Sequence, residues 1–324
     1  MKALYLGSEG LELRNDIPRP TPTPGEALIR LTRAGVCSTD LELVKGYAGF
    51  QGVLGHEFVG VVESVVGDSA SRDSRDWIGR RVVGTINLSC GDCQVCAGDG
   101  PEHCPTRTVL GIIGRDGAFG DYLTLPVANL LEVPENLHDD NAVFTEPLAA
   151  ALRIREQITV APTARTVVLG AGRLGLLIAQ VLRLAGGRVL ILGRRAESLE
   201  LPRQLGFDTG LAEEAESDAF DLVVEATGND QGLAQALRLV RPQGTLVLKS
   251  TFAGKASVDL TKLVVGEVRV VGSRCGPFEP ALRLLADGAI ETDALVDGDY
   301  ALNDGLEAFA HAARPGVRKI LLRP

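Results

Sequence analysis

The sequence predicts an α/β protein in which a mostly-β part precedes a doubly wound parallel sheet. Between residues 147 and 276, short apolar runs that suit strands alternate with stretches of helical periodicity. This alternation is typical of a parallel sheet covered on both faces. Before residue 136, short strand patterns alternate with turns rich in Gly, Pro and Asp. The length of 324 residues suits two domains of about 150 residues each.

The composition predicts a packed protein that binds neither nucleic acid nor membrane. Apolar residues make up 45% of the chain and charged residues 23%, which favours a core over disorder. The formal net charge of −9 argues against a nucleic-acid binder. No apolar run reaches the roughly 20 residues of a membrane span, and the first residues lack the apolar core of a signal peptide. We expect a cytoplasmic protein.

Five short segments of the first part have the pattern of strands. The prolines between Pro18 and Pro24 forbid a central strand or helix and indicate an extended connection. From Asp139 the pattern becomes helical, and we expect a domain boundary near Pro147. The expected strands are 26–31, 58–66, 81–86, 122–125 and 130–133.

The second part has five apolar strand runs and three helical stretches, and a tail follows. The tail contains two helical stretches and a strand, and it is expected to fold back on the first domain. The expected strands are 166–169, 188–192, 220–225, 245–249, 268–272 and 318–322; the expected helices are 174–185, 198–205, 232–240, 279–287 and 302–313.

A glycine-rich turn joins the first strand of the second part to an apolar helix. Gly170, Gly172 and Gly175 have the spacing of a dinucleotide fingerprint, with Arg173 and Leu174 inside it. The first glycine would make the tight turn, the second would admit a pyrophosphate, and the third would pack the helix on the strand. The anion would sit at the helix N-terminus. The strand–turn–helix context predicts a bound dinucleotide.

The end of the next strand indicates which dinucleotide binds. NAD-specific folds place Asp or Glu there to bind the ribose 2′-OH, but this strand ends in Gly193 followed by Arg194 and Arg195. A small residue leaves room for a 2′-phosphate, and guanidinium groups bind phosphate. We therefore favour NADP(H), the alternative being that both arginines are merely solvated. Further cofactor-lining loops at strand ends are expected at Thr227-Gly228 and Ser250.

Four cysteines close together predict a structural zinc site. Cys90, Cys93, Cys96 and Cys104 can converge from one loop on a tetrahedral ion. A redox Cys-x-x-Cys or surface thiols would need only two of them. The loop has few large apolar residues, so metal rather than core would hold its shape.

A second set of metal-type side chains is dispersed through the first part. Cys37 follows a strand, His56 and Glu57 precede another, and Glu146 lies at the domain boundary. One sulfur, one imidazole and one or two carboxylates suit a catalytic zinc with an open position. Each also has an ordinary interpretation: a small buried cysteine, a core histidine or a solvated carboxylate.

These motifs, in this order, resemble the zinc-dependent medium-chain dehydrogenases/reductases, which form the alcohol dehydrogenase superfamily, and in particular its threonine/sorbitol dehydrogenase-like branch. The resemblance covers nearly the full chain. It implies a GroES-like catalytic domain at 1–147 with a structural zinc lobe at about 88–105, and a Rossmann domain at 148–276. A C-terminal segment at 277–324 would return to the catalytic domain. The matching motifs are Gly35-Val-Cys37-x-Thr39-Asp40, Gly55-His56-Glu57, the four-cysteine lobe, Glu146-Pro147-Leu148 and the glycine fingerprint.

The resemblance also implies roles for single residues. Cys37 and His56 would bind the catalytic zinc, with Glu57 or Glu146 as a further ligand. Asp40 would bond the imidazole of His56. Arg318 matches a position that contacts the cofactor pyrophosphate in some relatives.

A proton relay is implied in the same way. Thr39 would bond the substrate oxygen and pass its proton outward. Some alcohol dehydrogenases end this relay at a histidine, whereas this chain has Glu42 at that position. The relay could end at Glu42, at the cofactor ribose or in water.

The predicted function is a zinc-dependent oxidoreductase that transfers hydride between NADP(H) and an alcohol/carbonyl pair. The substrate would be a small secondary alcohol, polyol or aldehyde. The alternatives are a non-catalytic NADP(H)-binding protein on the same fold and a zinc-free quinone or enoyl reductase. Relatives are dimers or tetramers, so we expect a homodimer or homotetramer.

Overall fold

The structure is a computed structural model that describes residues 1–67, 76–98, 100–251 and 255–324. The chain divides into two compact units. The first consists of Met1–Glu146 together with Phe278–Pro324, and the second is Pro147–Pro277. The first unit thus contains both ends of the chain, and the second is one continuous insertion.

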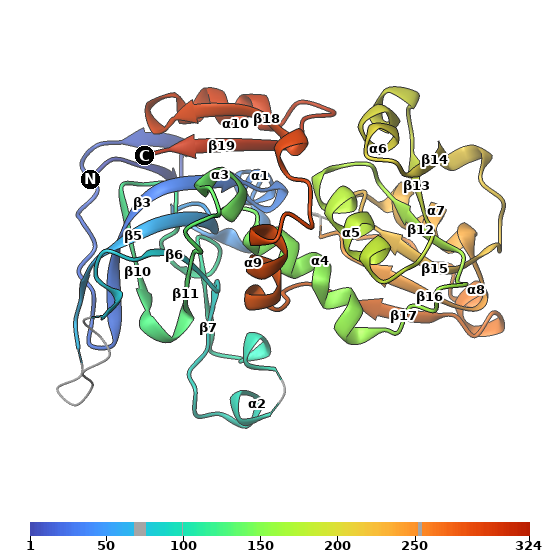
Figure 1. Cartoon of the computed structure of the whole chain (residues 1–324), viewed down its shortest axis with the longest axis horizontal. Coiled ribbons are helices and arrows are strands. Elements are labelled where there is room, and N and C mark those ends of the chain that lie inside the picture. Colours follow the sequence, from blue (N-terminus) through green and yellow to red (C-terminus); the bar gives the residue numbers. More distant parts are fainter. Residues whose placement is uncertain (68–75, 99, 252–254) are drawn as a thin grey trace. The chain divides into compact units, whose positions relative to one another are not determined.

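A seven-stranded sheet forms the centre of the first unit (Figure 1). Its strand order is β11-β6-β5-β3-β19-β18, and β10 pairs with β3 off this path. The long strand β3 pairs antiparallel with β5, β10 and β19, so it connects segments far apart in sequence. The strands are β3 (Glu26–Val36), β5 (Glu57–Val65), β6 (Arg81–Gly84), β10 (Tyr122–Pro126), β11 (Leu130–Glu132), β18 (Val296–Ala301) and β19 (Lys319–Arg323).

Two small sheets and short helices complete the first unit. One sheet has the order β2-β1-β4 and the other β7-β8-β9. Their strands are β1 (Ala3–Gly7), β2 (Gly10–Arg14), β4 (Gly52–Val53), β7 (Asn87–Leu88), β8 (Thr108–Leu110) and β9 (Gly114–Arg115). The helices are α1 (Ser38–Val44), α2 (Gln94–Ala97), α3 (Asp139–Ala142), α9 (Phe278–Ala286) and α10 (Gly305–Ala312).

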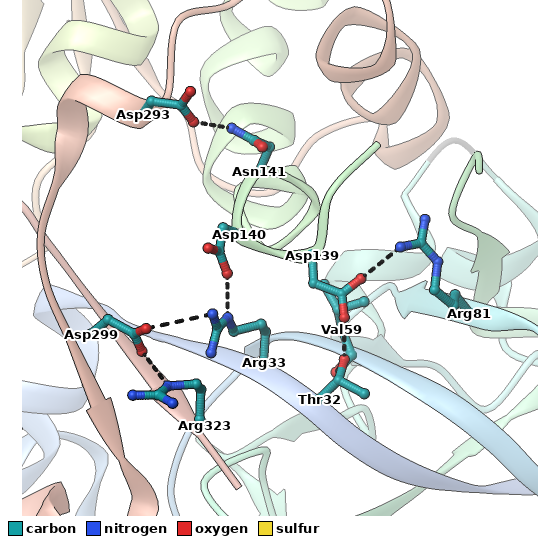
Figure 2. Close-up of polar contacts among 10 residues, drawn as sticks. All are labelled: Thr32, Arg33, Val59, Arg81, Asp139, Asp140, Asn141, Asp293, Asp299 and Arg323. Atoms are coloured by element: carbon teal, nitrogen blue, oxygen red, sulfur yellow. Dashed lines mark hydrogen bonds and ion pairs between the residues drawn. The ribbon is translucent and has the colours of Figure 1, made fainter. Parts of the chain in front are cut away.

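Polar side chains attach the C-terminal segment to the rest of the first unit (Figure 2). Arg33 on β3 pairs with Asp140 on α3 and lies 3.5 Å from Asp299 on β18. Asn141 donates to Asp293, which follows α9 in the chain, at 2.5 Å. Exposed pairs of this kind contribute little each, so the backbone pairing of β19 with β3 is the main attachment.

The second unit is a six-stranded parallel sheet in the order β14-β13-β12-β15-β16-β17. This is the 3-2-1-4-5-6 order of doubly wound dinucleotide-binding folds. Its strands are β12 (Thr166–Leu169), β13 (Val189–Gly193), β14 (Asp208–Leu211), β15 (Phe220–Glu225), β16 (Val240–Leu248) and β17 (Arg269–Gly272). Its helices are α4 (Thr145–Gln157), which begins at the unit boundary, α5 (Arg173–Leu184), α6 (Glu200–Gln204), α7 (Asp230–Leu239) and α8 (Leu260–Val265).

The core of the second unit explains why these segments adopt a parallel sheet. All four residues of β12 are buried, as expected for a strand covered on both faces. Helix α5 buries Leu176, Leu177 and Ile178, and its buried residues continue to Leu182. Each such side chain contributes about 1.5–3 kcal/mol when it leaves water. This burial fixes the helix that follows the glycine turn.

Most of the predicted elements occur within one to three residues of their expected bounds, and the α/β prediction is confirmed. Helix α1, which contains Thr39 and Asp40, was not predicted. Strands β4, β7, β14 and β18 and helices α2 and α8 were also not predicted. Within the described ranges, no helix is both long and apolar enough to cross a membrane.

Candidate metal centres and nucleotide site

The first candidate site begins where strand β3 meets helix α1. Cys37 is the N-cap of α1 and has extended backbone angles. Its backbone N–H donates to Asp40 Oδ2 at 2.8 Å, so the carboxylate of the third helical residue satisfies an N-terminal donor. This local bond fixes the turn that presents the Cys37 sulfur. Thr39 Oγ1 lies 3.8 Å from that sulfur.

Strand pairing brings His56 and Glu57 to the same place. Glu57 is the first residue of β5 and lies opposite Gly35 of β3, two residues before Cys37. The ligand atoms of Cys37, His56 and Glu57 all lie within 4.8 Å of one another. His56 and Glu57 are buried, with 3% and 1% of their surface exposed. Three residues of the predicted catalytic set therefore converge in one place.

Asp40 controls the charge of the imidazole. His56 Nδ1 lies 3.2 Å from Asp40 Oδ1, yet neither atom has a hydrogen bond of good alignment within the described chain. Burial opposes protonation, but the Asp40 carboxylate and the Cys37 sulfur outweigh it and hold the pKa of His56 well above its usual value. A metal ion would have to displace this proton, because imidazole binds metals in its neutral form.

Lys319 is a member of this site that sequence reasoning missed. Its Nζ donates to Glu57 Oε2, and both side chains are buried. Removing one partner of such a pair typically costs about 3–5 kcal/mol. Lys319 opens an apolar C-terminal strand, so the only available signal was a charged residue in a segment that had to be buried.

The donor set fits a zinc ion. A thiol, an imidazole and a carboxylate are ligands that catalytic zinc accepts, with a fourth position left for substrate. Glu57 Oε1 is buried and has no hydrogen-bond partner in the described residues, and a cation would satisfy it. Glu146 is not a member of this group in the part of the chain that the structure describes. Of the two carboxylates considered, the geometry favours Glu57.

The four clustered cysteines form the second candidate metal centre. Their Sγ–Sγ distances are 3.5 Å (Cys93–Cys96), 3.5 Å (Cys90–Cys104), 3.8 Å (Cys90–Cys96) and 3.9 Å (Cys93–Cys104). Zinc–sulfur bonds of 2.3 Å in a tetrahedron imply sulfur separations of about 3.8 Å. All four are free thiols, and a backbone hydrogen bond from Cys90 lowers the pKa of Cys104 to about 6. The cluster has the dimensions of a structural zinc site.

The predicted glycine turn lies at the carboxyl end of β12. Gly170 has a φ of +116°, and a Cβ there would lie 2.6 Å from Ala226 O. A Cβ on Gly175 would lie 1.9 Å from Gly170 O, so helix α5 can follow the strand this closely only with glycine. Gly172 is the N-cap of α5 and has open space on its side-chain face. A pyrophosphate could therefore approach the backbone there.

Neighbouring strand ends bring other predicted cofactor residues together. The N–H of Gly228, after β15, donates to Ser250 Oγ, after β16, at 2.8 Å. Thr227 donates from both its backbone and its hydroxyl to Glu225, which fixes the loop. Ligands of open α/β sheets bind at such carboxyl ends, where the strand order reverses. Arg318 lies in the first unit, where it pairs with Asp297 at 3.0 Å.

The end of β13 is closed to larger side chains. A Cβ on Gly193 would lie 2.6 Å from Ser198 Oγ and 2.9 Å from Leu199 Cδ2. An acidic residue of the NAD-specific type does not fit at this position without rearrangement. Arg194 and Arg195 follow and are exposed.

Comparisons with known proteins place the chain in a family. The family model for the alcohol dehydrogenase GroES-like domain matches residues 23–135, and that for zinc-binding dehydrogenase matches residues 174–287. An L-threonine 3-dehydrogenase of Streptomyces avermitilis is 31% identical, with 95% of this chain and 94% of the relative covered.

Solved structures agree with this placement. A zinc-binding dehydrogenase from Sinorhizobium meliloti 1021, bound to NADP, has a TM-score of 0.88 at 30% identity, covering 100% of this chain and 99% of the other. An alcohol dehydrogenase from Escherichia coli CFT073, complexed with NADH, has a TM-score of 0.89 at 26% identity, with the same coverage.

A GroES-like domain combined with a Rossmann domain defines the class of medium-chain, nicotinamide-dependent dehydrogenases. The chain belongs to the zinc-type medium-chain alcohol dehydrogenase family, and it is an oxidoreductase that acts on CH–OH donors. The predictions of fold class, family and enzyme class are confirmed.

The cysteine cluster predicts a metal-dependent contribution to stability. We expect Cys96→Ser to lower the zinc content from two ions to one per chain and to lower the melting temperature, because zinc holds a loop with little core. Mass spectrometry of the metal content and calorimetry measure both. Cys275→Ser changes a cysteine outside both metal-type groups, so it is the control and should keep both ions. Unchanged zinc content in Cys96→Ser would contradict the assignment.

Proposed function

We propose that the chain is a zinc-dependent dehydrogenase that transfers hydride between NADP(H) and a secondary alcohol, a polyol or an aldehyde. Residues 1–147 with 277–324 would form the catalytic part, and residues 148–276 would bind the nucleotide. The observation that carries the proposal is the convergence of Cys37, His56 and Glu57 within 4.8 Å in a member of this family. Six free thiols suit a reducing compartment such as the cytoplasm.

Three residues would bind the metal ion directly, and a fourth would orient one of these ligands. Cys37, His56 and Glu57 would bind zinc, and Asp40 would orient the imidazole through Nδ1. When bound there, zinc lowers the pKa of a coordinated alcohol, and the nicotinamide exchanges hydride with the substrate carbon. Burial of His56 and Glu57 excludes water, which strengthens each of these electrostatic contacts.

The proposal includes a proton path that leaves this site along α1. The Thr39 hydroxyl, 3.8 Å from Cys37 Sγ, would accept the proton of the substrate hydroxyl. Glu42 follows three residues later on the same helix face, and its carboxylate lies 2.8 Å from Lys45 Nζ. We infer that the relay ends at Glu42, which replaces the histidine used by some relatives.

A substrate panel tests the activity. With NADP⁺ we expect oxidation of secondary alcohols or polyols, measured by NADPH formation, and reduction of the matching carbonyls with NADPH. In metalloenzymes, loss of a residue outside the ligand shell already lowers activity about 10–100-fold. Cys37→Ala removes a proposed ligand, so its activity should fall by more than about 100-fold. Cys275→Ala is the matched control. Full activity of Cys37→Ala, or of metal-free protein, would contradict a zinc mechanism.

NADP(H) is preferred in this proposal because β13 ends in Gly193, which has no carboxylate to bind a ribose 2′-OH, and because two exposed arginines follow it. We expect Arg194→Ala/Arg195→Ala to raise KM for NADP⁺ about 10–100-fold, since a bond to a charged group is worth about 1.5–3 kcal/mol. The KM for NAD⁺ should stay unchanged. Arg188→Ala, at the other end of β13, is the control. A wild-type preference for NAD⁺ would contradict the assignment.

Self-association is supported by the edge of the nucleotide-binding sheet. Strand β17 ends the strand order, so its outer edge has no partner within the described residues. The crossover that leads into it exposes Val264 and Val265, with 76% and 79% of their surface accessible. An unpaired strand edge, together with exposed apolar side chains in the segment just before it, is typical of a two-fold interface. We therefore propose a homo-oligomer that buries this edge.

Charged substitutions test the interface. Val264→Glu/Val265→Glu should convert the oligomer to smaller species in sedimentation velocity, because buried charges would face each other across the two-fold axis. Leu184→Glu, an exposed leucine on α5 in the same unit, is the control. An unchanged sedimentation coefficient in the double variant would contradict this interface.

A further inference from the structure

A lysine without contact to solvent lies beside the candidate catalytic metal site. Lys319 is 0% exposed, and its Nζ donates to Glu57 Oε2. Nζ also lies 5.4 Å from the centre of the Phe144 ring, whose face attracts a cation. Gly35 is adjacent, and a Cβ there would lie 2.4 Å from Oε2. Glu57 Oε2 is therefore enclosed by its neighbours, and Lys319 is its hydrogen-bond partner.

The two oxygens of Glu57 are in different situations. Oε2 is held by Lys319, whereas Oε1 is buried and has no hydrogen-bond partner among the described residues. Glu57 also offers an oxygen within 4.8 Å of the ligand atoms of Cys37 and His56. A buried carboxylate oxygen without a partner is costly unless a cation binds it.

We propose that Lys319 is a positioning residue that holds Glu57 Oε2 and so restricts Glu57 to one oxygen, Oε1, as a metal ligand. The proposal rests on the metal site of the proposed function. A carboxylate that binds through one oxygen takes up one coordination position, whereas binding through both would crowd the position needed by the substrate.

The charge of Lys319 has a second consequence. The buried ammonium neutralises part of the Glu57 carboxylate's charge, and that charge is what Glu57 offers to a metal ion. Lys319 thereby weakens metal binding, and the ion keeps more of its positive charge for the substrate oxygen. A lysine with a purely structural role would stabilise the fold without this effect on metal affinity.

A double-mutant cycle read by Co²⁺ binding tests the proposal. The full-length protein is freed of metal by dialysis against a chelator and titrated with Co²⁺, whose visible bands report thiolate ligation. The part of the signal that Cys37→Ala removes belongs to this site. We expect Lys319→Met to bind Co²⁺ about 10–100-fold more tightly. Changes outside the ligand shell usually weaken binding by such a factor, and the sign is reversed here because Glu57 is freed to bind through both oxygens. In a Glu57→Gln background, Lys319→Met should change the affinity little.

The remaining outcomes are also decisive. Unchanged or weaker Co²⁺ binding in Lys319→Met would overturn the proposal, as would an equal change in both backgrounds. If Lys319→Met is unfolded without metal, we expect Co²⁺ to restore its fold, because the ion then pairs with the Glu57 carboxylate, and failure to do so would overturn the proposal. Lys262→Met, which removes a surface lysine paired with Asp218, is the control. If Cys37→Ala leaves the Co²⁺ signal intact, the metal site of the proposed function fails as well.

Discussion

The pairing of β3 with its neighbours is the constraint on which the candidate catalytic site depends. On one side, Gly35 lies opposite Glu57, which brings His56 and Glu57 beside Cys37. On the other side, β19 pairs with the end of β3, with Ile320 opposite Val36, which places Lys319 at the same point. A slip of one residue in either pairing would turn these side chains to the opposite face of the sheet. Three distant segments thus meet through backbone register.

The same register concentrates charge where there is little water. Asp40, His56, Glu57 and Lys319 are all buried, and each negative group faces a positive or ionisable one. The compensation is incomplete, because Asp40 Oδ1, His56 Nδ1 and Glu57 Oε1 lack well-aligned hydrogen bonds within the described chain. A buried set with such unsatisfied atoms is expensive as pure structure. A metal-binding role would explain why the fold maintains these buried, unsatisfied groups.

The sequence was most informative where function depends on local spacing. The glycine turn and the cysteine cluster were predicted residue by residue, because their geometry follows from positions a few residues apart. Cys37 and His56 were placed together only by family resemblance, since strand register is a long-range property. Lys319 was missed because its one local signal, a charge at the start of an apolar strand, does not reveal which distant side chain it pairs with. The α1 helix was missed because a seven-residue helix has too little periodicity to detect.

The central claim is that Cys37, His56 and Glu57 hold a zinc ion separate from the one in the cysteine cluster. Anomalous diffraction at the zinc absorption edge, from crystals of the protein as purified, tests it most directly. The account predicts two peaks per chain, one among the four cysteines and one among Cys37, His56 and Glu57, with one oxygen of Glu57 bound. A single peak in the cysteine cluster, with Glu57 still bound only to Lys319, would contradict it.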